Sequence, residues 1–165
     1  MTPPFTPSRR TVVRTAAWSV PVVAVSAAAP AFAASTVGLT YNPGGSAPDF
    51  DGAFYNYVFR GASLTFTGDA GPSTLTLTVT FEPTSGAPLV YTENTAPTGW
   101  TLAPRPGGNT DPVVFTYQTQ VRGGDVVPIE DGLYFGNDVF GQEGTFVLTF
   151  RALGFPDTQW LAPTS

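Results

Sequence analysis

The chain of 165 residues contains no cysteine and no histidine, and all seven of its basic residues are arginines. The missing cysteine excludes disulfide bonds, a thiol nucleophile and lipid attachment to an N-terminal cysteine. The missing histidine removes the usual general base and the usual zinc or copper ligand. Without lysine there is no Schiff base and no phosphate-binding P-loop. The fold therefore depends on its hydrophobic core, and few catalytic chemistries remain.

The N-terminal segment has the three parts of a secretory signal peptide, which are a basic start, an apolar middle and a small-residue end. The end is Ala31-Phe32-Ala33, and it predicts a signal peptide over residues 1–33 that is cleaved before Ala34. The alternative is an uncleaved transmembrane anchor, since residues 16–34 have about the right length. Serines and prolines interrupt that stretch, and alanine adds little transfer energy. We expect a secreted or cell-envelope protein with no membrane span after cleavage.

The basic start of the leader resembles the twin-arginine export signal. Arg9 and Arg10 follow Ser8 and precede Thr11, two valines and Arg14. In that family of signals, paired arginines precede a residue of any type, two apolar residues and a basic one. The resemblance covers the leader alone, and it implies a bacterial protein whose domain folds before export.

Residues 34–165 are strongly acidic. They hold all 12 acidic residues of the chain and four of its arginines, which gives a net charge of −8. Such a surface repels phosphate, so we expect no nucleic-acid partner. A segment of this length corresponds to about one domain and is long enough to bury a core.

The same residues have the pattern of β-strands separated by turns. In "STLTLTVTF" the apolar residues Leu75, Leu77, Val79 and Phe81 alternate with threonines, which is typical of a strand with one buried face. Other segments with a strand-like pattern lie at 37–41, 53–59, 63–67, 89–92, 100–103, 113–121, 126–129, 133–135 and 145–150. No stretch has a convincing helical period. About eight or nine strands at these turn spacings predict a single all-β domain over 34–165, an antiparallel β-sandwich.

About the last 60 residues resemble bacterial extracellular Ig-like domains. The segments that carry the resemblance are "APTGWTL", "VVFTYQTQVRGGDVVPIEDGLYFGN" and "GTFVLTFRA". In that family a Gly-Trp strand precedes a glycine-centred turn and a closing strand that starts with glycine, a small hydroxyl residue and phenylalanine. The resemblance implies an Ig-like sandwich but no particular function, because this architecture has many roles.

Asp49-Phe50-Asp51-Gly52 is a candidate calcium site. The carboxylates of Asp49 and Asp51, one residue apart, can offer oxygens to one ion. The segment is not an EF-hand loop, because its twelfth position is Arg60 instead of glutamate. The alternative is a turn in which aspartate accepts backbone N–H bonds. No other cofactor is expected.

Tyr55, Tyr57 and Trp100 are the candidate ligand-binding residues, with Trp160 as a further ring. Flat rings on the face of a sandwich can stack on sugars. The segment "FYNYVF" has aromatic residues on both faces, so one face is expected to be exposed. The alternative is packing in the core, to which aromatic side chains contribute strongly. The expected partner is an extracellular protein or glycan.

No catalytic residue is predicted. Serine and threonine lack an imidazole partner, so only carboxylates remain as acid–base groups. We expect a non-catalytic binding or structural module outside the membrane. Two alternatives stay open, a self-assembling envelope subunit joined through sheet edges and a carboxylate-based extracellular glycan hydrolase. The hydrolase would use glutamates such as Glu82, Glu93, Glu130 and Glu143.

Overall fold

The computed structural model describes residues 36–92, 96–132 and 134–165. Several predictions from the sequence concern residues outside these ranges. They are the leader over 1–33, its cleavage site before Ala34, Glu93 and the start of the expected strand at 133. The described chain contains no α-helix and one 3-10 turn, η1 (Gly108–Thr110). None of its helices has the length and apolar character needed to span a membrane. The all-β prediction is confirmed.

Twelve strands make up the described fold. They are β1 (Gly38–Asn42), β2 (Ala47–Phe50), β3 (Tyr55–Val58), β4 (Ser63–Thr67), β5 (Leu75–Pro83), β6 (Val90–Thr92), β7 (Trp100–Leu102), β8 (Val113–Tyr117), β9 (Val126–Pro128), β10 (Tyr134–Asn137), β11 (Gly144–Ala152) and β12 (Thr158–Pro163). They form three sheets, with the orders β12-β11-β5-β8-β7, β1-β4-β9 and β2-β3-β10-β6. Every pair of neighbouring strands is antiparallel.

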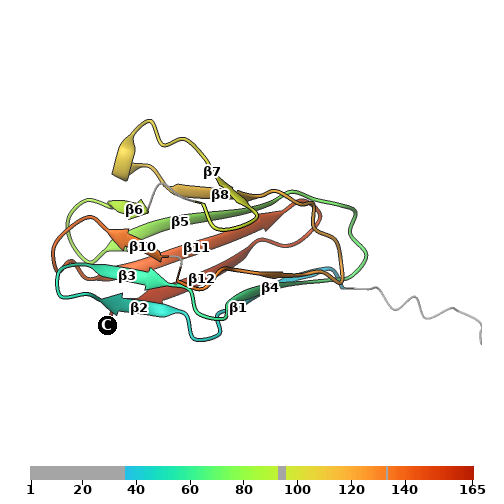
Figure 1. Cartoon of the computed structure of the whole chain (residues 1–165), viewed down its shortest axis with the longest axis horizontal. Coiled ribbons are helices and arrows are strands. Elements are labelled where there is room, and N and C mark those ends of the chain that lie inside the picture. Colours follow the sequence, from blue (N-terminus) through green and yellow to red (C-terminus); the bar gives the residue numbers. More distant parts are fainter. Residues whose placement is uncertain (1–35, 93–95, 133) are drawn as a thin grey trace, which may run out of the picture. The chain divides into compact units, whose positions relative to one another are not determined.

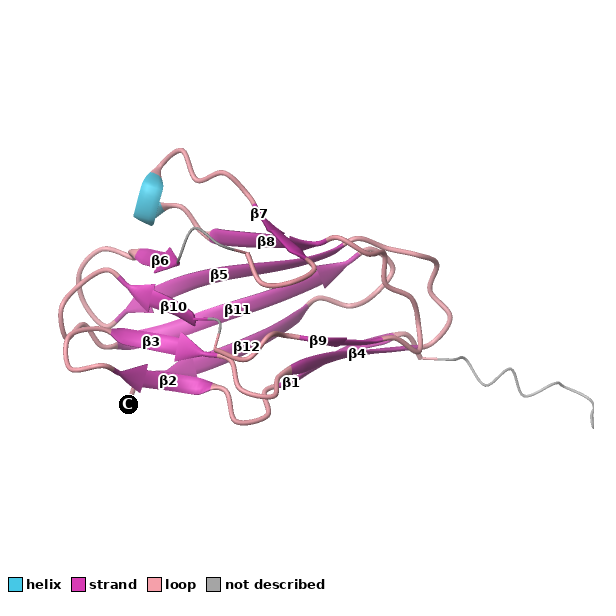
Figure 2. Ribbon diagram, viewed as in Figure 1, coloured by secondary structure: helices cyan, strands magenta, loops and turns pink. Residues whose placement is uncertain are grey.

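The two smaller sheets pack on the five-stranded sheet and form the second layer of a sandwich. Each of the long strands β5 and β11 runs alongside both smaller sheets (Figures 1 and 2). In the three-stranded sheet the ring of Tyr41 stacks on Phe150 of β11 at 4.7 Å. In the four-stranded sheet the ring of Phe135 lies 5.8 Å from Phe115 of β8. The buried side chains of all three sheets belong to one hydrophobic core, as expected for a β-sandwich.

The second layer consists of two sheets because its strands are interrupted at the same level. Strand β1 pairs with β4 as far as Asn42 and Ser63, and the pairing of the same two chain segments resumes between β2 and β3 at Ala47 and Val58. At the break Gly44 has φ +60°, and a Cβ there would lie 2.5 Å from the carbonyl oxygen of Gly61. Only glycine fits this conformation and this space.

The break also separates β9 from β10, so three extended segments of the second layer are each counted as two strands. The structure has twelve strands where the sequence pattern predicted about eight or nine. The pattern separated 53–59 from 63–67 and 126–129 from 133–135, as the break does, but it identified no strand at β2 or β12.

The long strands have the predicted alternation. Leu75, Leu77, Val79 and Phe81 of β5 are at most 2% exposed, and the threonines between them lie on the outer face. Strand β11 likewise buries Phe146, Leu148 and Phe150, and β8 buries Val113 and Phe115. Strand β8 ends at Tyr117, however, so the strand expected over 113–121 is too long by four residues.

Three of the prolines in strands lie in strands at the edges of the sheets, and a fourth, Pro83, is the last residue of the inner strand β5. Pro48 lies in β2, Pro128 in β9 and Pro163 in β12, and each of these strands ends its sheet. Proline has no N–H to donate to an added strand, so it obstructs the growth of a sheet from that edge.

Candidate binding site

Four strands place one row of residues on the outer face of the four-stranded sheet. Asp49 of β2 lies opposite Asn56 of β3, Asn56 lies opposite Gly136 of β10, and Gly136 lies opposite Tyr91 of β6. Successive residues of a strand point to opposite faces. Because Tyr57, the next residue after Asn56, is fully buried in the core, the row faces away from the core.

A surface pocket of about 280 Å³ lies at this row, lined by Asp49, Asp51, Asn56, Val58 and Tyr91. In the middle of the row, Gly136 leaves the space that the ring of Tyr91 occupies. A Cβ on Gly136 would lie 2.2 Å from Cε1 of Tyr91 and 2.7 Å from Oδ1 of Asn56. The backbone of Gly136 is not left-handed, so this position requires glycine for space, as strands do where another group approaches closely.

Asp51 closes the turn between β2 and β3. Its Oδ1 accepts hydrogen bonds from the backbone N–H groups of Ala53 and Phe54, both at 2.8 Å, and its Oδ2 accepts one from Nδ2 of Asn56 at 3.0 Å. These bonds, first that from Phe54 and then that from Ala53, hold the pKa of Asp51 below its usual value. An aspartate turn of this kind is the structure expected for this segment if it does not bind calcium.

Asp49 pairs with a cation of the chain itself. Its Oδ2 accepts a hydrogen bond from a terminal guanidinium nitrogen of Arg60 at 3.2 Å, and both side chains are about half exposed. In the ranges that the structure describes, no three acidic side chains converge as a metal site would need. Both carboxylates therefore have partners within the chain, and calcium at Asp49 and Asp51 stays a prediction.

Asn56 is the buried polar group of the pocket. Only 8% of it is exposed, and its Nδ2 donates to Asp51 and, at 3.5 Å, to the carbonyl oxygen of Phe54. Its Oδ1 has no hydrogen-bond partner. An unsatisfied buried acceptor costs about 1–3 kcal/mol, and such an atom in a pocket is a natural point for a ligand to donate a hydrogen bond.

Two of the three predicted ligand-binding rings lie in the core instead of on the surface. Tyr57 is fully buried, and its hydroxyl is 2.9 Å from that of Tyr41. Trp100 is 4% exposed and packs on Tyr117 at 5.1 Å. Neither ring presents a face to a sugar, so this corrects the expectation for both of them.

Tyr55 is partly exposed and packs on Phe50 at 4.9 Å. Trp160 is also partly buried, with its ring 5.7 Å from that of Tyr41. The position of the tyrosines follows from the register of β3. Every second residue of this strand faces inward, so Tyr55 and Tyr57 lie on the inner face, and Asn56 and Val58 lie on the outer face. The aromatic residues of this segment could be identified from the sequence, but the face that carries Tyr55 and Tyr57 turns toward the core and the opposite face is free.

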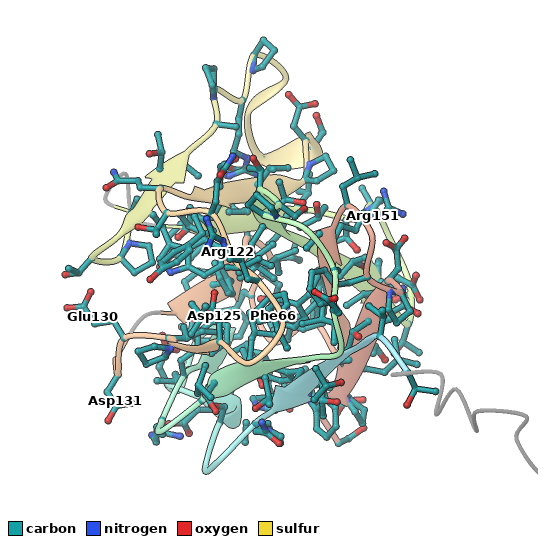
Figure 3. All side chains as sticks on the ribbon, turned by 90° about the vertical axis from the view of Figure 1, so that its right-hand side faces the viewer. Phe66, Arg122, Asp125, Glu130, Asp131 and Arg151 are labelled. Carbon is teal, nitrogen blue, oxygen red and sulfur yellow. The ribbon has the colours of Figure 1, made fainter. Side chains whose placement is uncertain are left out.

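The glutamates proposed for a hydrolase are exposed where the structure describes them, namely Glu82, Glu130 and Glu143. Glu130 accepts a hydrogen bond from the backbone N–H of Thr98 at 2.8 Å. Figure 3 shows Glu130 beside Asp131 on one flank of the molecule, with Arg151 on the other flank. Asp131 in turn accepts a hydrogen bond from the backbone N–H of Gly61 at 2.5 Å. These carboxylates bind nearby backbone groups.

Sequence reasoning did not select Asn56, Tyr91 or Gly136. One signal was present, because a glycine inside an apolar strand such as "YFGN" indicates a close approach by another group. Nothing in the local sequence indicates that Tyr91 is that group, since the two residues belong to different strands. Comparisons with protein-family models, with curated proteins and with solved structures found no match for this chain.

Proposed function

We propose that residues 34–165 form an exported, non-catalytic binding module that works outside the membrane. The observation that supports it most is the pocket on the outer face of the four-stranded sheet, where Asn56 keeps an unpaired acceptor beside Tyr91. Pockets with a few placed polar groups and an aromatic wall are the usual form of small-ligand sites. The leader over 1–33 supports export, and its paired arginines favour the twin-arginine route.

We also propose an Ig-like relationship for the sandwich. Its support is the two-layer packing together with the strands β7, β8 and β11, which carry the segments that resemble Ig-like domains. This relationship concerns architecture and does not bear on the ligand.

Two measurements test the proposed function. The first is the intact mass of the protein recovered separately from the culture medium and from the envelope. A chain that begins at Ala34 is expected outside the cytoplasm, and a folded cytoplasmic protein that keeps residues 1–33 would contradict export. The second is retention of the purified protein on insoluble cell-wall and plant glycans, with the supernatant assayed for released sugars.

Retention without released sugars is the expected result. Released sugars that disappear in Glu82→Gln, Glu130→Gln or Glu143→Gln would instead establish the hydrolase. Growth in sedimentation coefficient with concentration would favour the self-assembling envelope subunit. The prolines in three edge strands argue against this last alternative.

A further inference from the structure

We propose that the pocket at Asp49, Asn56, Gly136 and Tyr91 binds one sugar ring of a neutral saccharide. This inference rests on the proposed function, since it names the ligand class of the same site. It uses a different set of residues from the rings that the sequence pattern suggested.

The first argument is the pairing of the charged groups. Asp49 already accepts from Arg60, and Asp51 already accepts from three N–H groups. A metal ion or a basic peptide would have to compete with these donors. Asn56 also points its amide nitrogen, and not its oxygen, toward the carboxylate of Asp51. The amide oxygen and this carboxylate therefore do not bind one cation together. A neutral ligand leaves these bonds in place.

The second argument is the free acceptor. Oδ1 of Asn56 is buried and unpartnered, in a side chain that is 8% exposed and lines the pocket. A charged donor costs far more to remove from water than a hydroxyl group does, so a ligand hydroxyl suits this buried acceptor. Asp49 lines the pocket and Arg60 lies 3.2 Å from it, so this ion pair brings an acceptor and a donor close together beside Asn56. Several polar groups of both kinds around a small space suit the hydroxyls of a sugar.

The third argument is the ring of Tyr91. It is partly exposed, and it lies over Gly136 with Cε1 and Cδ1 within 2.7 Å of where a Cβ would be. One side of a sugar ring consists of C–H groups and packs on an aromatic face, while its edge carries hydroxyls. Oδ1 of Asn56 is buried and lies 2.7 Å from the same Cβ position, so the ring of Tyr91 has to shift when a ligand hydroxyl reaches this oxygen.

The fourth argument is the size of the space. A volume of about 280 Å³ falls just below the roughly 300–1,000 Å³ of sites for drug-sized ligands. The pocket is open to solvent along the sheet, so it accepts one ring while the remainder of an oligosaccharide continues over the surface.

The test uses the isotope-labelled full chain and nuclear magnetic resonance. The probes are cellohexaose, maltohexaose, mannohexaose and chitohexaose, with calcium chloride and hexalysine as cationic probes. At least one saccharide is expected to shift both the side-chain amide signal of Asn56 and the backbone amide signal of Gly136. Tyr91→Ala is expected to weaken that binding about tenfold or more, because the stacking face is lost.

Three variants make the test specific. Tyr91→Phe keeps the ring, so it should retain most of the affinity. Gly136→Ala places a Cβ 2.2 Å from Cε1 of Tyr91, so it displaces this ring and should abolish binding. Tyr91→Ala serves in its place if Gly136→Ala does not fold. Thr40→Ala, on an exposed site of β1 in the other small sheet, should change nothing.

Four outcomes would overturn the proposal. Saccharide shifts confined to other residues would show that the site is wrong, and equal affinity of Tyr91→Ala and wild type would remove the role of the ring. Shifts at Asn56 and Gly136 with only calcium or hexalysine would show that the ligand class is wrong. If no probe shifts these signals while the protein is still retained on glycans, the inference fails and the proposed function stands; if retention is absent as well, both fail.

Discussion

Replacing Tyr41 with phenylalanine should reduce the sensitivity of this fold to alkaline pH. The hydroxyls of Tyr41 and Tyr57 are 2.9 Å apart in the core, where the two residues are 6% and 0% exposed. Burial raises the pKa of both phenols, and the hydrogen bond to Tyr57 raises that of Tyr41 further. In the unfolded chain both phenols ionise at about pH 10.

The sign of the effect follows from proton linkage. Above about pH 10 the unfolded chain has released protons that the native core still holds, so the free energy of unfolding falls as the pH rises. Each phenol contributes about 1.4 kcal/mol per pH unit, so the pair contributes about 2.7 kcal/mol per unit until the native phenols ionise. Because the chain has no lysine and no cysteine, no other type of side chain competes in this range.

The substitution has two opposite consequences. At neutral pH, Tyr41→Phe leaves the hydroxyl of Tyr57 without this partner, which lowers the free energy of unfolding by about 1–3 kcal/mol. Above about pH 10 the variant loses stability only about half as fast as the wild type. The free energies of unfolding of the variant and the wild type should therefore become equal about one to two pH units above about pH 10.

The measurement is urea unfolding followed by circular dichroism at steps from about pH 8 to about pH 11. Tyr57→Phe should behave like Tyr41→Phe. The double substitution should remove the part of the alkaline loss in the free energy of unfolding that the two phenols contribute. An alkaline slope that is the same in the wild type, both single variants and the double variant would refute the reasoning.

Three further predictions concern the turn, the core and the break in the second layer. Because the pKa of Asp51 is lowered in the folded state, this carboxylate stabilises the fold above its unfolded pKa of about 3.9, and the stabilisation is lost as the pH falls through the folded pKa. Asp51→Asn should therefore lower the urea midpoint at neutral pH and make that midpoint less dependent on pH in acid. An acid dependence equal to that of the wild type would contradict this. Phe115→Ala removes a fully buried ring and should cost about 3–5 kcal/mol, so a loss below about 1 kcal/mol in urea would mean that the core collapses around it. Gly44→Ala places a Cβ 2.5 Å from a carbonyl oxygen at φ +60° and should cost more than about 1 kcal/mol, whereas Gly52→Ala, also left-handed but with open space around it, should cost less.

Local pattern determined the long strands. In β5 and β11 the apolar residues recur every second position, and a strand is the backbone conformation that brings such residues to one face. The same reasoning predicted a single all-β unit, and it identified Asp51 as a turn residue as an alternative to a metal ligand. These properties depend on neighbours within a few residues, so they can be predicted from the sequence.

Only the tertiary structure decided which side chains share the site. Asn56, Gly136 and Tyr91 lie in three strands far apart in the sequence, and the antiparallel register of β3, β10 and β6 makes them neighbours. That register also placed Tyr57 in the core, although the segment "FYNYVF" has aromatic residues on both of its faces. A slip by one residue in the pairing would exchange the two faces. The sequence by itself therefore determined that strands form and what they offer, whereas the packing of the two layers decided which face meets the core and which face is free to bind.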